Sequence, residues 1–307
     1  MIELIFNIAY SIIVIILGIT GNSLVVYTSL HYPSQTEDAI TIVFIRHLAI
    51  ADVCFVIGRA LPATLVLFTN SWVFGPVLCH ITAYCACVFP IANLNFIFFV
   101  SLHRLLRCTL PWEALKLTKL RAACMAGMIW AYSMVDLIII AVFQINAEYR
   151  ADILRCITNY TPFSNSYPTM WIIMWTWTKG LPFFGSLIIN LILLLYARNK
   201  THSMNLQAIK TVCSISGLLI LSWSPSVLYS VFLLCDGLSH VIVEKVSYNF
   251  YLISVFGNPI VYCFCNKNFL NFVDKTVERL CNKVITRYTG PEEQHPKAPR
   301  PSTPSNR

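Results

Sequence analysis

Five polar side chains interrupt long apolar stretches of this sequence at similar depths. They are Asn22, Asp52, Asn93, Ser254 and Asn258. A charge near the middle of a bilayer costs at least about 2.5 kcal/mol, so the carboxylate of Asp52 needs polar partners. If the stretches bundle as helices, these groups could share waters or a sodium ion. The predicted sodium ligands are Asp52, Asn93, Ser254 and Asn258; the alternative is a structural polar cluster that holds no ion.

Two cations stand where they could bind an acidic ligand. Arg59 lies seven residues, about 10 Å of helix, outward of Asp52, and Lys179 lies three residues before Pro182. Either side chain could anchor a carboxylate. The alternative for Arg59 is an ion pair with Asp136, and the alternative for Lys179 is an ammonium that extends to the membrane interface.

The last apolar stretch contains the sequence Asn258-Pro259-Ile260-Val261-Tyr262. A proline inside a helix removes one hydrogen bond and kinks the rod. Asn258 and Tyr262 also bring polar groups into hydrocarbon, where something must satisfy them. This costly combination predicts a moving part.

Enzyme chemistry finds no support in the sequence. A membrane zinc hydrolase needs histidines clustered with a carboxylate. The histidines here are dispersed, and several lie between apolar stretches: His31, His47, His80, His103, His202, His240 and His295. We therefore expect no enzyme activity and no cofactor beyond the possible sodium ion.

Seven apolar stretches position these residues, each long enough to cross a bilayer as a helix of about 20 residues. They are Ile2–Leu30, Ala39–Phe68, Leu78–Cys108, Leu120–Phe143, Trp171–Tyr196, Gln207–Leu234 and Val241–Phe264. With 57% hydrophobic and only 12% charged residues, the chain is far more apolar than a soluble domain. The sequence predicts an all-α membrane protein, a bundle of seven transmembrane helices.

Basic residues set the predicted orientation. Seventeen of the 22 lysines and arginines fall on one side of the membrane. The five on or toward the other side are Arg59, Arg150, Arg155, Lys179 and Lys245. Because cytoplasmic loops carry the positive excess, we expect the N-terminus outside and the C-terminus in the cytoplasm. Anionic membrane lipid accounts for the net charge of +8, and no nucleic acid is expected as a partner.

Two cysteines face the oxidising side. Cys79 opens the third stretch and Cys156 lies in the longest outer loop, so a disulfide could join them, with Cys235 as the rival partner. Asn159 begins a glycosylation sequon in the same loop, whereas the sequon at Asn199 lies inside. Cys281 is a candidate for palmitoylation or an ordinary interfacial cysteine.

The predicted seven-helix domain spans residues 1–280 and ends in a short amphipathic cytoplasmic eighth helix at 266–280. Residues 281–307 are predicted to be a disordered tail, because prolines and polar residues dominate the end of the chain.

Several motifs together resemble the rhodopsin-like (class A) G-protein-coupled receptors. They are Gly21-Asn22, Leu48 to Asp52, Trp72 to Gly75 before Cys79, Trp130, Pro182, Trp223-Ser224-Pro225 and Asn258 to Tyr262. The resemblance runs from about residue 12 to 280 in order. It implies a plasma-membrane receptor in which an extracellular small ligand repacks the outer helices around Trp223 and the Pro225 kink, and a heterotrimeric G protein reads the inner end.

Arg104 stands at the cytoplasmic end of the third stretch, where the family's arginine meets the G protein. The residue before it is His103, where the family usually has an acid, and the residue after it is Leu105, where the family usually has tyrosine. Asn190 also stands where many family members carry a tyrosine. These departures favour a second interpretation, a non-signalling decoy or scaffold with the same fold.

His-Arg in place of Asp-Arg is similar to the purinergic, hydroxycarboxylic acid and oxoeicosanoid receptor branch. That resemblance implies an anionic ligand, and the sequence favours a lipid or small carboxylic acid. Aromatic residues that could line the site are Tyr84, Trp175, Trp177, Tyr229, Tyr248 and Tyr251, although an interface belt would have the same composition. The inner loop Ala197–Leu206 is short, as in many family members that couple to inhibitory G proteins, so the resemblance also implies a G protein of the inhibitory class.

Overall fold

The computed structural model describes residues 2–31, 39–110, 118–159, 168–199, 206–236, 241–265 and 267–289. Within them, five helical runs are long and apolar enough to cross a membrane: Leu4–His31, Ile40–Thr69, Gly75–Thr109, Lys119–Val142 and Ile172–Tyr196. Two further long helices follow, α11 (Leu206–Asp236) and α12 (Val241–Cys265). All seven coincide with the predicted stretches to within about three residues at each end.

Two of the membrane-length runs contain a π turn. The first five runs are α1 (Ile2–His31); α2 (Ala39–Phe55), η1 (Val56–Ala60) and α3 (Leu61–Thr69); α4 (Gly75–Thr109); α6 (Lys119–Ser133) and α7 (Val135–Val142); and α9 (Pro168–Trp175), η2 (Thr176–Gly180) and α10 (Leu181–Asn199). Pro62 and Pro182 follow η1 and η2 by two residues. Because a proline ring clashes with the carbonyl four residues earlier, each π turn absorbs a local misfit.

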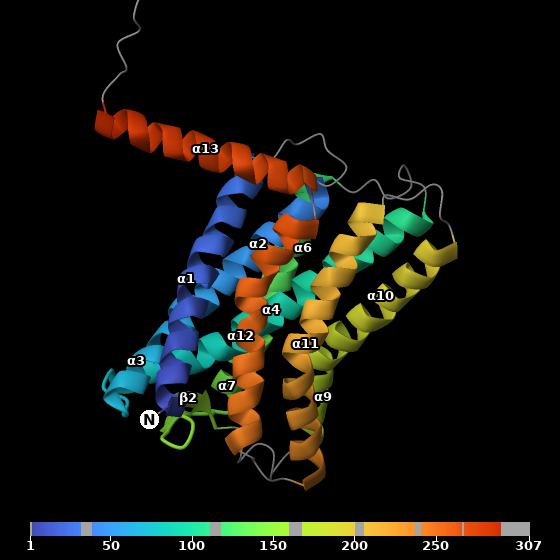
Figure 1. The fold of residues 1–307 in the computed structure, drawn as a ribbon. Helices are drawn as coiled ribbons and strands as arrows, with labels where there is room; N and C mark the ends of the chain where they lie inside the picture. The colour runs from blue at the N-terminus through green and yellow to red at the C-terminus, as the bar shows by residue number, and fades with distance from the viewer. Residues whose placement is uncertain are drawn as a thin grey trace, which may run out of the picture.

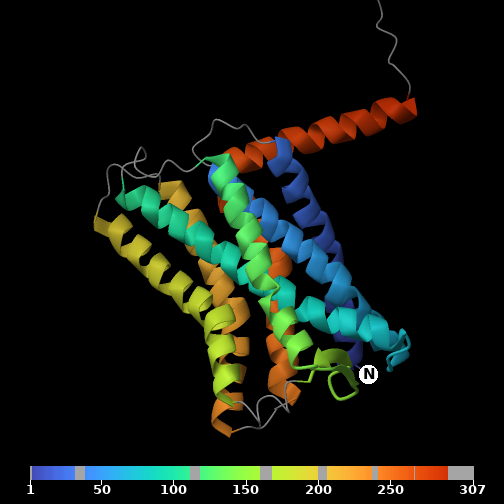
Figure 2. The ribbon, with the colours of Figure 1, turned by 180° about the vertical axis from the view of Figure 1, so that it is seen from behind.

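The helices form one bundle with distinct ends. In Figure 1 the start of α1 and the loop between α7 and α9 lie at one end, which is called the outer end below. The helix after α12 lies across the other end, which is called the inner end. Neighbouring helices α11 and α12 pack together, and α1 contacts both α2 and α12. Figure 2 shows α6 on the opposite face, where it contacts α2 and α4.

The longest outer loop contains a β-hairpin, which the all-α prediction did not include. Strands β1 (Ala147–Arg150) and β2 (Arg155–Thr158) pair antiparallel, with Arg150 opposite Arg155 and Tyr149 opposite Cys156. Strand pairing satisfies backbone groups that an irregular loop would leave open as it crosses the end of the bundle. The hairpin contacts the outer part of α4.

The eighth helix, α13 (Lys267–Thr289), is longer than predicted. It continues nine residues beyond residue 280, so the predicted start of the tail at residue 281 is wrong. The sequence between 281 and 289 has neither glycine nor proline, and Gly290-Pro291 then provides the stop signal. Residues 290–307, the rest of the predicted tail, lie outside the described residues.

Close packing between α11 and α12 gives a testable contrast between two glycines. An added Cβ at Gly257 would lie 2.7 Å from Cδ2 and 2.9 Å from Cδ1 of Leu218, whereas one at Gly127 meets nothing within 4 Å. We expect Gly257→Ala to lower stability by about 1–3 kcal/mol through overpacking. We expect Gly127→Ala to raise it by up to about 1 kcal/mol through helix propensity.

Thermal unfolding of the two variants purified in detergent would check this contrast. Equal midpoints for the two variants would contradict the packing of α11 on α12 described above.

Candidate functional site

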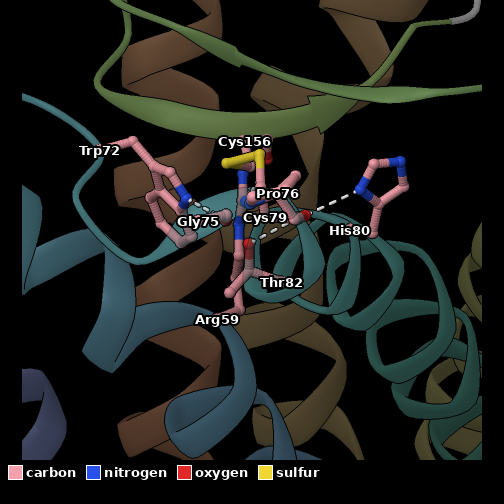
Figure 3. The surroundings of a disulfide bond; sticks show 8 residues. All are labelled: Arg59, Trp72, Gly75, Pro76, Cys79, His80, Thr82 and Cys156. Carbon is pink, nitrogen blue, oxygen red and sulfur yellow. Dashed lines mark hydrogen bonds between the residues drawn. A yellow bond between two sulfur atoms is a disulfide. The ribbon is translucent and has the colours of Figure 1, made fainter.

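The π turn η1 places Arg59 inside the outer end of the bundle. Arg59 is buried, and its Nη1 donates a hydrogen bond to the backbone carbonyl of Cys156. Figure 3 shows the side chain extending from its helix toward the cystine beneath the hairpin. The guanidinium carbon also lies 5.9 Å from the centroid of the Tyr248 ring. Arg59 therefore joins α2, the hairpin and α12.

The predicted disulfide between Cys79 and Cys156 is present, which settles the choice against Cys235. It ties β2 to the first turns of α4 (Figure 3). Beside it, Trp72 donates from Nε1 to the carbonyl of Gly75 at 2.7 Å, and its ring lies 6.4 Å from that of Tyr149. The cystine and the aromatic contact hold the hairpin over the outer end of the bundle.

Arg155 is a site residue that the sequence interpretation missed. It is buried, and its guanidinium carbon lies 4.0 Å from the centroid of the Tyr248 ring. Burial, together with the neighbouring charge of Arg59, lowers the pKa of Arg155 to about 10. The available signal was position, because Arg155 directly precedes a cysteine that the disulfide fixes over the bundle.

Arg150, opposite Arg155 in the hairpin, faces a different set of groups. Its Nη1 lies 3.1 Å from Oε2 of Glu244 on α12, and its guanidinium also pairs with Asp152. The hydrogen bond from Arg150 lowers the pKa of the Asp152 carboxyl. The tie to Glu244 makes α12 a second attachment point for the hairpin, in addition to the cystine on α4.

Further inward than Tyr248, packed aromatic rings connect α12 to α11 and α2. The buried ring of Tyr251 packs edge-to-face on Trp223 at 5.2 Å and on Phe55 at 4.8 Å. Within the described residues, neither the Tyr251 hydroxyl nor Nε1 of Trp223 has a hydrogen-bond partner. Arg59, Tyr248, Tyr251 and Trp223, all predicted ligand residues, are therefore grouped together at the outer end.

Three other predicted ligand residues lie apart from that group. Tyr84 packs beside Cys87 and Ile140 at α7, and Lys179, placed by η2, is the charge that acts on the buried Asp136. Among the described residues no ion pair joins Arg59 to Asp136: Arg59 bonds to the carbonyl of Cys156, and Oδ1 of Asp136 is buried without a hydrogen-bond partner, so the alternative ion pair is wrong. Tyr229 of α11 acts electrostatically on Arg150 of the hairpin.

At mid-bundle, Asp52 is fully buried and accepts two amide hydrogen bonds. Asn93 Nδ2 donates to its Oδ1 at 2.7 Å, and Asn258 Nδ2 donates to its Oδ2 at 3.0 Å. Asn22 instead donates to the backbone carbonyls of Gly18 and Val255, which joins α1 to α12. The hydroxyl of Ser254 donates to the carbonyl of Tyr251 at 2.7 Å. Asp52 thus links α2, α4 and α12.

At the inner end, polar contacts join α4 to its neighbours. His103 Nδ1 and the hydroxyl of Thr41 share a hydrogen bond of 3.2 Å, which joins α4 to α2. Asn190 Nδ2 donates to Oγ of Ser101 at 3.1 Å, which joins α10 to α4. The predicted switch residues Arg104 and Tyr262 are both buried, and Pro225 and Pro259 lie inside α11 and α12.

Both predicted modification sites lie within the described residues. Asn159 follows β2 at the outer end and is half-buried, and the threonine of its sequon lies outside the described residues. Cys281 is exposed on α13 at the opposite end. Their modification stays a prediction.

Comparison with known proteins decides what kind of bundle this is. A family model described as "7 transmembrane receptor (rhodopsin family)" matches residues 21–262. The chain belongs to this family. The match begins at Gly21 and ends at Tyr262, the first and last of the residues that define the motifs above. The receptor is thus a multi-pass plasma-membrane protein that responds to an extracellular ligand and signals through G proteins, and it is not an enzyme.

Individual relatives are similar over half of the receptor or more. Somatostatin receptor type 2 of Sus scrofa is 24% identical over 274 residues, which cover 84% of this chain and 73% of that receptor. Neuropeptide Y receptor type 2 of Mus musculus is 26% identical over 294 residues, or 87% of this chain and 74% of the other. Cysteinyl leukotriene receptor 2 of Homo sapiens is 28% identical over 153 residues, 50% of this chain and 43% of the other. These names do not test the resemblance to the purinergic and hydroxycarboxylic acid branch, which stays a prediction.

Proposed function

We propose that a lipid or small carboxylic acid activates this receptor from the extracellular side. The observation that carries the proposal is Arg59, a buried cation in contact with Tyr248 at the outer end of the bundle. A buried guanidinium favours an anionic partner, and the rings inward of it offer apolar surface. The proposed ligand residues are Arg59, Tyr84, Lys179, Trp223, Tyr229, Tyr248 and Tyr251.

The proposed signal passes inward along contacts in α11 and α12. Tyr251 contacts Trp223, two residues before Pro225. Tyr251 and Tyr262 lie on the two sides of the Asn258-Pro259 pair, and Asn258 is bonded to Asp52 of α2. A ligand that moves Tyr251 therefore acts on helices that are already kinked by proline. The proposed switch residues are His103, Arg104, Trp223, Pro225, Asn258, Pro259 and Tyr262.

We propose a G protein of the inhibitory class as the partner at the inner end, on the basis of the short loop between α10 and α11. The distribution of basic residues supports an external N-terminus and a cytoplasmic C-terminus. In this orientation, α13 and Cys281 face the cytoplasmic lipid surface, and Asn159 faces outside, where glycosylation occurs.

The mid-bundle cluster fits a sodium ion as a proposed ligand. The donors would be Asp52, Asn93, Ser254 and Asn258. Oδ1 of Asn93 and Oδ1 of Asn258 are buried and have no hydrogen-bond partner among the described residues. Carboxylate, amide and hydroxyl oxygens suit a hard cation. An ion there would favour whichever packing of α2, α4 and α12 keeps these oxygens together.

Arg104→Ala is the variant that tests signalling. In a cell assay of G-protein activation with a panel of carboxylic acids and lipids, we expect the ligand-driven response to fall at least about tenfold, because the buried Arg104 stands where the family meets its G protein. Arg107→Ala, which removes the same charge one turn further along α4, is the matched control. A response that depends equally little on both arginines would contradict the proposal.

A second candidate function is a decoy or scaffold that binds ligand without activating G protein. The observations that favour it are the contacts of His103 with Thr41 and of Asn190 with Ser101, which join α4 to α2 and to α10. Such ties would hold the inner end closed. Ligand binding without a G-protein response, in the presence of normal surface expression, would select this candidate.

A further inference from the structure

Two buried arginines from separate parts of the chain meet at one ring. Arg155 of β2 lies 4.0 Å and Arg59 of η1 lies 5.9 Å from the centroid of Tyr248. Arg155 is 6% exposed and Arg59 is 5% exposed. Tyr248 acts electrostatically on both arginines, and the positive charge of Arg59 opposes that of Arg155. Two like charges are thus held together away from bulk water.

No carboxylate among the described residues pairs with either guanidinium. Glu244 is the carboxylate that acts electrostatically on both arginines. Its Oε2, however, forms a salt bridge with Arg150. Within the described chain, Nε of Arg155 is buried and has no hydrogen-bond partner. A buried cation without an anion is strongly disfavoured, because its lost hydration is not replaced. The cation–π contact with Tyr248 compensates for only part of this lost hydration.

Contacts that other residues make hold both arginines in place. The disulfide fixes Cys156, whose carbonyl accepts from Arg59 and whose preceding residue is Arg155. The salt bridge between Arg150 and Glu244 ties the other strand of the hairpin to α12. Because these contacts do not use a ligand, the two guanidiniums are preorganised, which reduces the entropy lost on binding.

We propose that Arg59 and Arg155 together bind one anionic group, a carboxylate or a phosphate, beside Tyr248, and that Arg155 makes the receptor selective for anionic ligands. Planar guanidinium groups match the oxygens of both anions by paired hydrogen bonds. The proposal rests on the proposed function, because both place an anionic ligand at Arg59 on the outer side; what it adds is the part of Arg155. In this proposal the β1–β2 hairpin contributes a ligand-binding residue, Arg155, to the site.

The test uses small anions, so that it does not depend on the rest of the ligand. Purified full-length receptor is unfolded thermally in 100 mM sodium acetate, in 100 mM acetamide with equal sodium chloride, and in sodium phosphate at matched ionic strength. We expect acetate or phosphate to raise the midpoint by about 2–3 °C over the acetamide and chloride controls. The anion that gives the larger shift at equal concentration identifies the favoured group.

Three variants locate the effect. Arg155→Met and Arg59→Met are expected to abolish the shift, whereas Lys245→Met, which removes one positive charge from the outer end of α12, is expected to keep it. Arg155→Met without anion should unfold at the same temperature as the parent or higher, because it removes a desolvated charge. Arg155→Lys keeps the charge but not the paired hydrogen bonds, and we expect a half-saturating concentration at least about tenfold higher.

Several results would overturn the proposal: no shift with either anion, a shift of equal size with acetamide, a shift that survives Arg155→Met, or equal losses in Lys245→Met and Arg155→Met. The two arginine variants separate this proposal from the proposed function: a shift that is lost in Arg59→Met but survives in Arg155→Met would overturn the arginine pair and leave Arg59 as the anchor of the proposed ligand. Anion binding without any signal dependent on Arg104 would count against the signalling function alone.

Discussion

Replacing Cys156 with serine is expected to lower the free energy of unfolding of the receptor by about 4 kcal/mol. The disulfide joins residues separated by 77 positions in the sequence, and a cross-link of that span removes much conformational freedom from the unfolded chain. The hairpin would also lose its attachment to α4. We expect the thermal midpoint to fall by about 10 °C and less receptor to reach the cell surface.

Two controls separate the cross-link from the loss of a side chain. Cys79→Ser should give the same loss, and the double variant should be no worse than either single one, because all three remove one bond. Cys281→Ser changes an exposed cysteine at the opposite end of the bundle and should leave the midpoint unchanged. Additive losses in the double variant would contradict this account.

Asp52→Ala is expected to destabilise the receptor by about 2–4 kcal/mol. The carboxylate accepts from Asn93 and Asn258, which are 0% and 1% exposed, so both amide groups would lose an acceptor in a place that water does not reach. Each buried donor without a partner costs about 1–3 kcal/mol. Asp52→Asn keeps one acceptor oxygen and should cost less. Thermal unfolding in detergent measures both effects.

A pair of asparagines on α4 provides the matched control for the Asp52 cluster. Asn93→Ala breaks the bond to Asp52, whereas Asn95→Ala breaks only a bond from Nδ2 to the carbonyl of Ile91 in its own helix. We expect the first to lower the midpoint clearly more than the second. Equal effects, or an unchanged midpoint for Asp52→Ala, would show that the cluster does not hold the three helices together.

The membrane-spanning helices could be predicted because about 20 apolar residues in a row have few other stable arrangements. The grouping of Asp52 with Asn93 and Asn258 could be predicted for a related reason, since a buried charge needs partners and few were available at that depth. The prediction ended α13 at residue 280 although the sequence has no stop signal before Gly290, so this boundary too could have been predicted.

The outer site was harder to predict because its geometry depends on packing between distant segments. Whether Arg59 faces Asp136 or Tyr248 depends on the extra residue that η1 absorbs, and the sequence marks that turn only through Pro62. Arg155 reaches Tyr248 because two strands pair and a disulfide anchors one of them. A loop sequence without apolar periodicity indicates neither event.

The two π turns also bear on how such a receptor can diverge. Losing a single codon within Val56–Ala60 would convert that turn to ordinary α-helix. Because the wide turn takes up the extra residue, the helix beyond it would keep its facing, and only the side chains within the turn, Arg59 among them, would be removed or redirected. Thr176–Gly180 offers the same possibility on the other side. Gene copies that differ by one inserted or deleted amino acid could thereby acquire new chemical preferences while every helix keeps its neighbours.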